Sequence, residues 1–139
     1  MGYSRVFRLG EKMDRLKATN LNPIVLAFVG DAVYSLFIRE RLTFSADYKT
    51  GELNRLATSE VNASAQADFV NEILPLLTEE ELSVFKRARN AKKGTKAKHA
   101  TIAEYNCATG FEAVLGFLYL IGETERLNFL LNKGKDHES

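Results

Sequence analysis

The sequence has few of the residues on which disulfides, zinc sites and nucleophilic active sites depend. Tryptophan is absent, and the single cysteine, Cys107, excludes an internal disulfide and fits a reducing compartment. The two histidines, His99 and His137, lie in a basic stretch and in the C-terminal tail, so no cysteine–histidine cluster could bind zinc. No phosphate-binding glycine loop, dinucleotide-binding motif or GxSxG motif occurs. Zinc chemistry and catalysis by a Ser–His or Cys–His pair therefore have little support.

Long apolar runs at the N-terminus and low-complexity linkers are also missing. The first 20 residues are polar and contain no pattern of a secretory signal or membrane helix. With 139 residues, two prolines and a hydrophobic fraction of 45%, the chain fits one domain over 1–139, with its core at about 22–132. We expect a cytoplasmic protein that does not enter a membrane.

The spacing of the apolar residues predicts an all-α fold. No segment alternates apolar and polar residues over the length of a strand, and no Asn-Gly or Asp-Gly hairpin signal occurs. Asn22 and Pro23 are typical of a helix start, and the sequence TEEE at 78–81 is a capping box. Residues 24–42 are apolar almost all round and predict a central helix. The other expected helices cover 50–59, 62–77, 79–89, 101–121 and 123–132.

Two acidic residues stand in the two most apolar segments of the chain. Asp31 lies within VLAFVGDAVYSLFI, and Glu112 lies within ATGFEAVLGFLYL. An ionised carboxylate in apolar surroundings is costly unless it is paired or binds a metal, so a buried salt bridge explains either residue equally well. The two together favour a shared cation site, because magnesium takes oxygen ligands and needs few from the protein. Gly30 and Gly116 would let the two helices approach closely, although ordinary packing explains them equally well.

The basic residues are concentrated in one stretch, although the net charge of the chain is only +1. No acidic residue occurs between Leu82 and Ala103. Such a stretch can bind a polyanion locally, and a solvated loop is the alternative. The residues predicted to bind the polyanion are Arg89, Asn90, Lys92, Lys93, Lys96 and Lys98.

Three segments resemble the motifs of one family, in the order in which that family has them. LAFVGDAV, residues 26–33, resembles the signature of ribonuclease III catalytic domains, and ATGFEAVLGFLYL, residues 108–120, resembles their second acidic helix. KRARNAKKGTKAKHAT, residues 86–101, resembles the basic loop of the short branch called Mini-ribonuclease III. The resemblance covers residues 22–132, nearly the whole chain.

The resemblance implies a helical homodimer in which magnesium-bound carboxylates hydrolyse double-stranded RNA, leaving 5′-phosphate and 3′-hydroxyl ends. Asp31 and Glu112 match the family's catalytic, metal-binding acids. Ala27 and Thr109 stand where longer members carry two further acids, and the Mini branch resembles this chain in both gaps. Thr109 is expected to orient a metal-bound water, since it lies one turn before Glu112. We expect the dimer interface to use the two apolar helices, at 24–42 and 101–121.

The implied substrate is structured precursor RNA, particularly the paired ends of the large-subunit ribosomal RNA precursor. No double-stranded RNA-binding domain follows the last expected helix, so the catalytic dimer itself would bind RNA through the basic stretch. A ribosomal protein is a candidate helper. One alternative is a non-catalytic module that binds RNA or the ribosome, for which Ala27 and Thr109 are the best support. A second alternative, a nucleotide phosphohydrolase, lacks a suitably placed histidine.

Overall fold

The computed structural model describes residues 11–45, 49–61, 63–92 and 101–133, and every regular element in these ranges is helical. The all-α class expected from the sequence is confirmed. The elements are α1 (Arg15–Thr19), α2 (Pro23–Ser45), α3 (Thr50–Val61), α4 (Ala63–Ile73), the 3₁₀ turn η1 (Leu74–Leu76), α5 (Glu79–Asn90), α6 (Ile102–Leu120) and α7 (Thr124–Leu131).

The helix starts follow from local capping chemistry. The Asn22 side chain accepts a hydrogen bond from the backbone N–H of Ile24, at 2.8 Å, as expected at the start of α2. Thr78 opens α5 with a complete capping box, in which its hydroxyl and the Glu81 carboxylate each accept a hydrogen bond from the other residue's backbone N–H. The expected helix over 62–77 ends early, at Ile73, because a proline in the following 3₁₀ turn cannot continue an α-helix.

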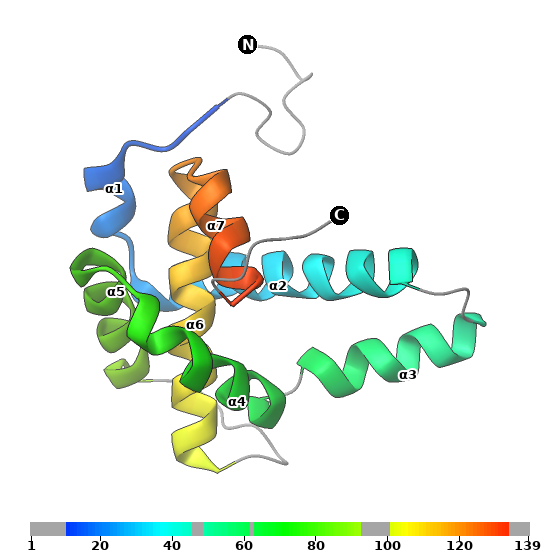
Figure 1. Ribbon diagram of the computed structural model, residues 1–139. Helices are drawn as coiled ribbons and strands as arrows, with labels where there is room; N and C mark the ends of the chain where they lie inside the picture. The colour runs from blue at the N-terminus through cyan, green and yellow to red at the C-terminus, as the bar shows by residue number, and fades with distance from the viewer. Residues whose placement is uncertain (1–10, 46–48, 62, 93–100, 134–139) are drawn as a thin grey trace.

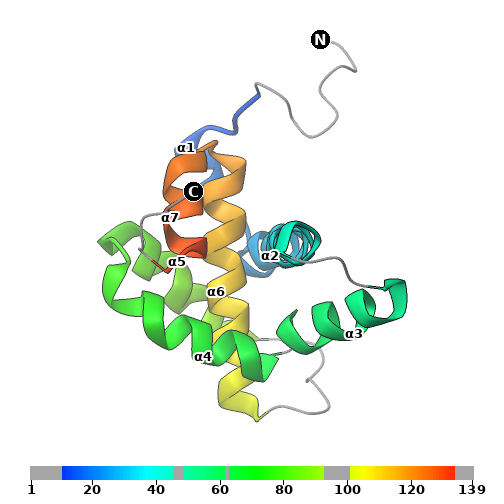
Figure 2. The ribbon, with the colours of Figure 1, turned by 45° about the vertical axis from the view of Figure 1, so that its right-hand side comes forward.

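Helix α6 is the centre of the fold. Figures 1 and 2 show α6 running through the middle, with α4 and α5 against one side, α7 beside its C-terminal half and α2 crossing it. The prediction that the helix over 24–42 is the central one is therefore wrong. The buried residues of α6 are Ala108, Thr109, Gly110, Phe111, Ala113, Val114, Leu115, Gly116, Phe117 and Leu118.

The crossing of α2 over α6 depends on two glycines. A Cβ atom added to Gly30 would lie 1.6 Å from the backbone oxygen of Glu112, and one added to Gly116 would lie 2.0 Å from the backbone oxygen of Leu26. Neither position has room for any side chain, so the two backbones are in direct contact. The close approach expected from these glycines is confirmed, and it places the Asp31 segment of α2 against the Glu112 segment of α6.

One face of α2 is apolar and exposed. Val25, Phe28 and Leu36 are 47%, 80% and 59% exposed, and Ala32 between them is exposed as well. Their spacing of three and four residues places them along one side of the helix. We call these four residues the α2 stripe. Among the described helices, none is both long and apolar enough to span a membrane.

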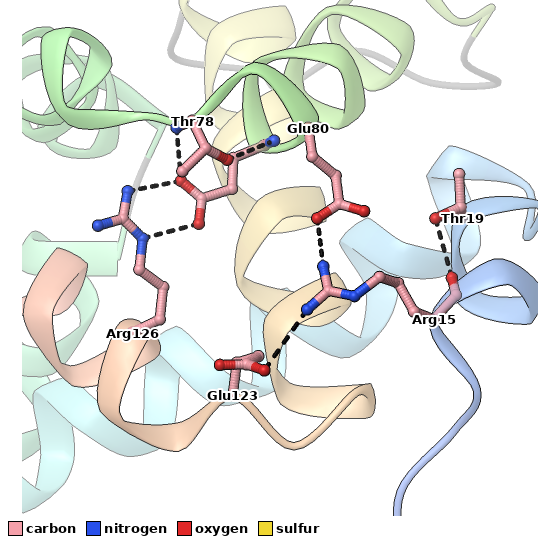
Figure 3. A network of polar contacts seen from close by, with 7 residues as sticks. Arg15, Thr19, Thr78, Glu80, Glu123 and Arg126 are labelled. Carbon is pink, nitrogen blue, oxygen red and sulfur yellow. Dashed lines mark hydrogen bonds and ion pairs between the residues drawn. The ribbon is translucent and has the colours of Figure 1, made fainter.

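Charged side chains join the peripheral helices to one another. Arg15 on α1 forms ion pairs with Glu80 on α5 and with Glu123 just before α7, as Figure 3 shows. Arg126 on α7 donates two hydrogen bonds of 2.7 Å to the buried carboxylate of Glu81. Burial raises the pKa of Glu81, but the hydrogen bonds and charge of Arg126, with the hydrogen bonds from Thr78, hold it below its usual value. These contacts join α1, α5 and the start of α7 to one another beside α6.

Candidate active site

The side chains of Asp31 and Glu112 meet where α2 crosses α6. They share a hydrogen bond, although they are far apart in the sequence and on different helices. The backbone contact at Gly30 and Gly116 brings about this meeting, because Gly30 directly precedes Asp31 and its missing side chain makes room for the backbone of Glu112. The structure therefore joins the two acids predicted from the sequence into one cluster.

The two carboxylates differ in their surroundings. Asp31 is exposed, so the expectation that apolar side chains surround it is wrong. Glu112 lies mostly within the protein, and its pKa is raised from 4.5 to about 9, first by burial and then by its hydrogen bond to Asp31 and the charge of Asp31. In the metal-free protein at neutral pH, Glu112 therefore carries a proton.

A third polar group, Gln66 on α4, belongs to the same cluster and was not predicted from the sequence. Its side chain is 1% exposed, and its amide nitrogen donates a hydrogen bond of 3.2 Å to Oε2 of Glu112. This bond lowers the pKa of Glu112, against the larger effects of burial and Asp31. In the sequence, Gln66 lies in a mixed segment of polar and apolar residues, AQADFVNE, where a glutamine is normally interpreted as a surface residue.

Among the residues that the structure describes, no basic side chain contributes to this cluster. The groups that shift the pKa of Glu112 are Asp31 and Gln66, neither of which is a cation. The described contacts of Glu112 therefore do not form a buried salt bridge, which was the alternative explanation for this residue. Two acids in hydrogen-bond contact repel each other when both are ionised, and they need a shared proton or a cation.

Ala27 and Thr109, which stand where longer family members carry two further acids, offer few ligands for a metal ion. Ala27 is buried in the core. Thr109 is 7% exposed, and its hydroxyl donates to the backbone oxygen of Tyr105 at 2.9 Å, so its proton is committed to its own helix. The Thr109 oxygen still has lone pairs that accept hydrogen bonds. To orient a metal-bound water, as predicted, Thr109 would therefore have to accept a hydrogen bond from that water.

The donor set fits a hard divalent cation with an open coordination shell. In the part of the chain that the structure describes, no group of three or more Asp, Glu, His or Cys side chains is gathered around one point, so the protein offers the two carboxylates. Magnesium commonly takes one or two carboxylates and fills the other positions with water and phosphate oxygens. Asp31 provides the exposed side of this site, and Glu112 the buried side.

The basic residues lie at and beyond the C-terminal end of α5. Arg89 stacks on the ring of Phe85, with 5.7 Å from the guanidinium carbon to the ring centre, and donates a hydrogen bond to Asn90. Lys92 is exposed. The other three predicted RNA-binding residues, Lys93, Lys96 and Lys98, lie outside the described residues. Arg87, also in the basic stretch, instead donates hydrogen bonds to the backbone oxygens of Thr19 and Leu21, at 2.7 and 3.3 Å.

The chain matches known proteins over most of its length. The sequence pattern of the Ribonuclease III domain matches residues 24–123. Mini-ribonuclease 3 of Clostridium tetani is 41% identical over 97% of this chain and 98% of its own length, and Mini-ribonuclease 3 of Brevibacillus brevis is 47% identical over 84% and 88%. A crystal structure of a Fusobacterium nucleatum protein aligns with a TM-score of 0.73 at 35% identity, covering 81% of this chain and 90% of that one.

These matches confirm the resemblance predicted from the three sequence motifs. Enzymes of this family act on double-stranded RNA and generally depend on a divalent metal ion. The pair of carboxylates at the crossing of α2 and α6 agrees with that requirement. The chain belongs to the ribonuclease III family of endoribonucleases.

Proposed function

We propose that this protein is a magnesium-dependent endoribonuclease that cleaves double-stranded RNA as a homodimer, with Asp31 and Glu112 as its metal-binding, catalytic residues. One observation carries the proposal: two acids from separate helices meet in hydrogen-bond contact, and among the described residues the groups that shift the pKa of Glu112 include no cation. The direct backbone contact of α2 and α6 makes this meeting a fixed property of the fold.

The chemistry follows from what each side chain can do. When bound, magnesium would polarise the scissile phosphate, activate a water molecule and stabilise charge on the leaving oxygen. Glu112 must release its proton to solvent to serve as a ligand, and the charge of a bound cation would favour the ionised form of both carboxylates. Asp31, being exposed, faces the side from which a phosphate group arrives. Gln66, being neutral, leaves the negative charge of the pair available to a cation.

The basic end of α5 lies near the first half of α6, the helix that carries Glu112. The charge of Arg89 acts on Cys107, which lies five residues before Glu112 on α6, or about 7.5 Å along the helix axis. A-form RNA is recognised mainly through its phosphates and 2′-hydroxyls, which suits lysine and arginine side chains. We infer that the basic stretch holds the phosphates next to the cleaved strand.

The exposed α2 stripe supports the homodimer. Helix α6 is mostly buried within the chain, and among its large apolar side chains Ile102 alone is exposed, at 58%. Of the segment 101–121, which was expected to contribute to the interface, we therefore propose that only the first turn does so. A contiguous apolar face beside the active site is a typical self-complementary interface.

A single substitution tests this interface. Phe28→Ser should shift the protein to a monomer in sedimentation equilibrium at micromolar concentration. Phe129→Ser, on α7, should leave the dimer intact. A wild-type monomer, or an unchanged Phe28→Ser dimer, would refute the proposed interface.

The proposed biological substrate is the large-subunit ribosomal RNA precursor, cut in the cytoplasm near its paired ends, with a ribosomal protein as a candidate helper. The similarity to proteins named Mini-ribonuclease 3 supports this choice of branch. The corresponding experiment compares cleavage of a precursor transcript containing these paired ends with cleavage of an unrelated duplex of equal length. Equal rates on the two RNAs would contradict a preference for the precursor.

Cleavage of a defined duplex tests the function itself. With magnesium, the protein should cut the duplex and leave 5′-phosphate and 3′-hydroxyl ends; in EDTA it should bind the duplex without cutting it. Duplex binding without cleavage under any divalent ion would point instead to a non-catalytic binding module. Cleavage that leaves 2′,3′-cyclic phosphate ends would rule out a metal-activated water as the attacking group.

A further inference from the structure

Gln66 stands out among the buried polar residues that the structure describes. The others have partners unrelated to the active site: Glu81 pairs with Arg126, and the Thr109 hydroxyl bonds to its own helix. Gln66 is 1% exposed and directs its amide nitrogen at Glu112, across the interface between α4 and α6. Burying an amide costs free energy that a leucine of similar size would avoid. The hydrogen bond to Glu112 recovers part of that cost and gives a functional reason for a glutamine at this position.

We propose that Gln66 is a positioning residue of the active site, whose amide N–H holds Oε2 of Glu112 so that the carboxylate presents its other oxygen to the metal beside Asp31. This inference rests on the proposed function of Asp31 and Glu112. It extends the site from two helices to three, because Gln66 belongs to α4, whereas the acids belong to α2 and α6.

A neutral donor is the side chain that such a site requires. A carboxylate that is free to rotate spends much of its time in orientations that do not suit the metal, and a hydrogen bond to one oxygen removes that freedom. A lysine or arginine here would orient Glu112 as well, but its positive charge would neutralise the site and repel the cation. Glutamine supplies the hydrogen bond without the charge.

The competing explanation is that Gln66 merely fills space between α4 and α6. The two explanations predict different results for a substitution that removes the donor and keeps the volume. A space-filling role predicts that an apolar residue of the same size leaves metal binding unchanged and stabilises the fold, since a buried amide is replaced by a hydrocarbon. A positioning role predicts weaker metal binding in a protein that is folded and stable.

The test compares Gln66→Leu and Gln66→Met with Val70→Ala in the full chain. Both substitutions at Gln66 keep the volume and remove the donor; methionine also keeps the unbranched shape. Val70 is equally buried, at 1%, and lies one turn further along α4, so its truncation disturbs the same helix without touching the donor. Three properties are measured for each protein: magnesium affinity by calorimetry, melting temperature in EDTA, and kcat and KM for a duplex RNA.

The Gln66 variants should bind magnesium about 10- to 100-fold more weakly, the range found when the outer partner of a metal ligand is removed. Their kcat at limiting magnesium should fall by a similar factor and recover at high magnesium, while KM for RNA is unchanged. Val70→Ala should melt at a lower temperature with unchanged magnesium affinity. Unchanged affinity in a folded Gln66→Leu or Gln66→Met protein overturns the inference. So does the unfolding of both variants in EDTA, which would make Gln66 a core residue.

A parallel Glu112→Gln protein separates this inference from the one on which it rests. If Glu112→Gln has lost both magnesium binding and cleavage while the Gln66 variants behave as wild type, the metal site is correct and only the role of Gln66 is wrong. If Glu112→Gln still binds magnesium and cuts RNA, the proposed metal site itself has failed.

Discussion

Replacing Glu112 by glutamine should stabilise the metal-free protein, by an amount that depends on pH. The pKa of Glu112 is raised to about 9 in the folded protein, from 4.5 in the unfolded chain. Between these values the folded state holds a proton that the unfolded chain has lost, so the free energy of unfolding falls as pH rises. One pKa unit corresponds to about 1.4 kcal/mol, which gives a loss of about 3 kcal/mol at pH 7 relative to pH 4.5. A glutamine at this position cannot ionise and escapes this loss.

Thermal denaturation in EDTA at pH 4.5 and pH 7 measures the effect. Glu112→Gln should match the wild type at pH 4.5 and melt higher at pH 7, with a rise on the order of 10 °C for about 3 kcal/mol in a chain of this size. Magnesium should then stabilise the wild type but not the variant. Glu125→Gln, an exposed change on α7, is the control and should have little effect. A Glu112→Gln protein that is less stable than wild type at pH 7 would refute the reasoning, because it would show that the carboxylate is held by a favourable charge pair.

The other substitutions test packing, the buried ion pair and the basic stretch. Gly116→Ala would force a Cβ to within 2.0 Å of a backbone oxygen and should cost about 3 kcal/mol or more in urea denaturation, whereas Gly51→Ala, which meets nothing within 4 Å, should be neutral or stabilising by up to about 1 kcal/mol. Glu81→Gln should cost about 3 kcal/mol at pH 7 by leaving its arginine partner unpaired. Because the pKa of Glu81 is lowered in the fold, its contribution exists above pH 4.5 and is lost as pH falls, so the variant and wild type should converge in acid. Filter binding across a salt series should show weaker duplex binding and a shallower salt dependence, with an unchanged fold, for the triple alanine variant of Lys92, Lys93 and Lys98.

Much of the fold was predictable because its signals are local. Capping residues and apolar spacing located the helices that begin after Asn22, Thr78 and Thr101 to within a few residues. The identity of the central helix was not predictable in this way. The segments of α2 and α6 are both apolar all round, and the sequence alone does not distinguish a helix buried by its own chain from one whose outer stripe is left exposed.

The cluster of polar residues that forms the candidate active site was predicted in part, and for a physical reason. Asp31 and Glu112 are visible in the sequence because acids are rare in apolar helices, and the adjacent glycines indicated that the helices touch. Gln66 gave a weaker signal: it lies three, four and seven residues before Phe69, Val70 and Ile73, on the apolar face of its helix, but a glutamine is ordinarily a surface residue. Its burial is a tertiary property that arises from the packing of α4 on α6.

Single-turnover cleavage tests most directly whether Asp31 and Glu112 together hold the catalytic metal. Wild type, Asp31→Asn and Glu112→Gln are each mixed in excess with an end-labelled RNA duplex in magnesium, and duplex binding is measured separately in calcium. The predicted result is that the wild type cuts the duplex, while both variants bind it with similar affinity and do not cut it. A variant that cuts at the wild-type rate per folded molecule would contradict the assignment of that residue to the metal.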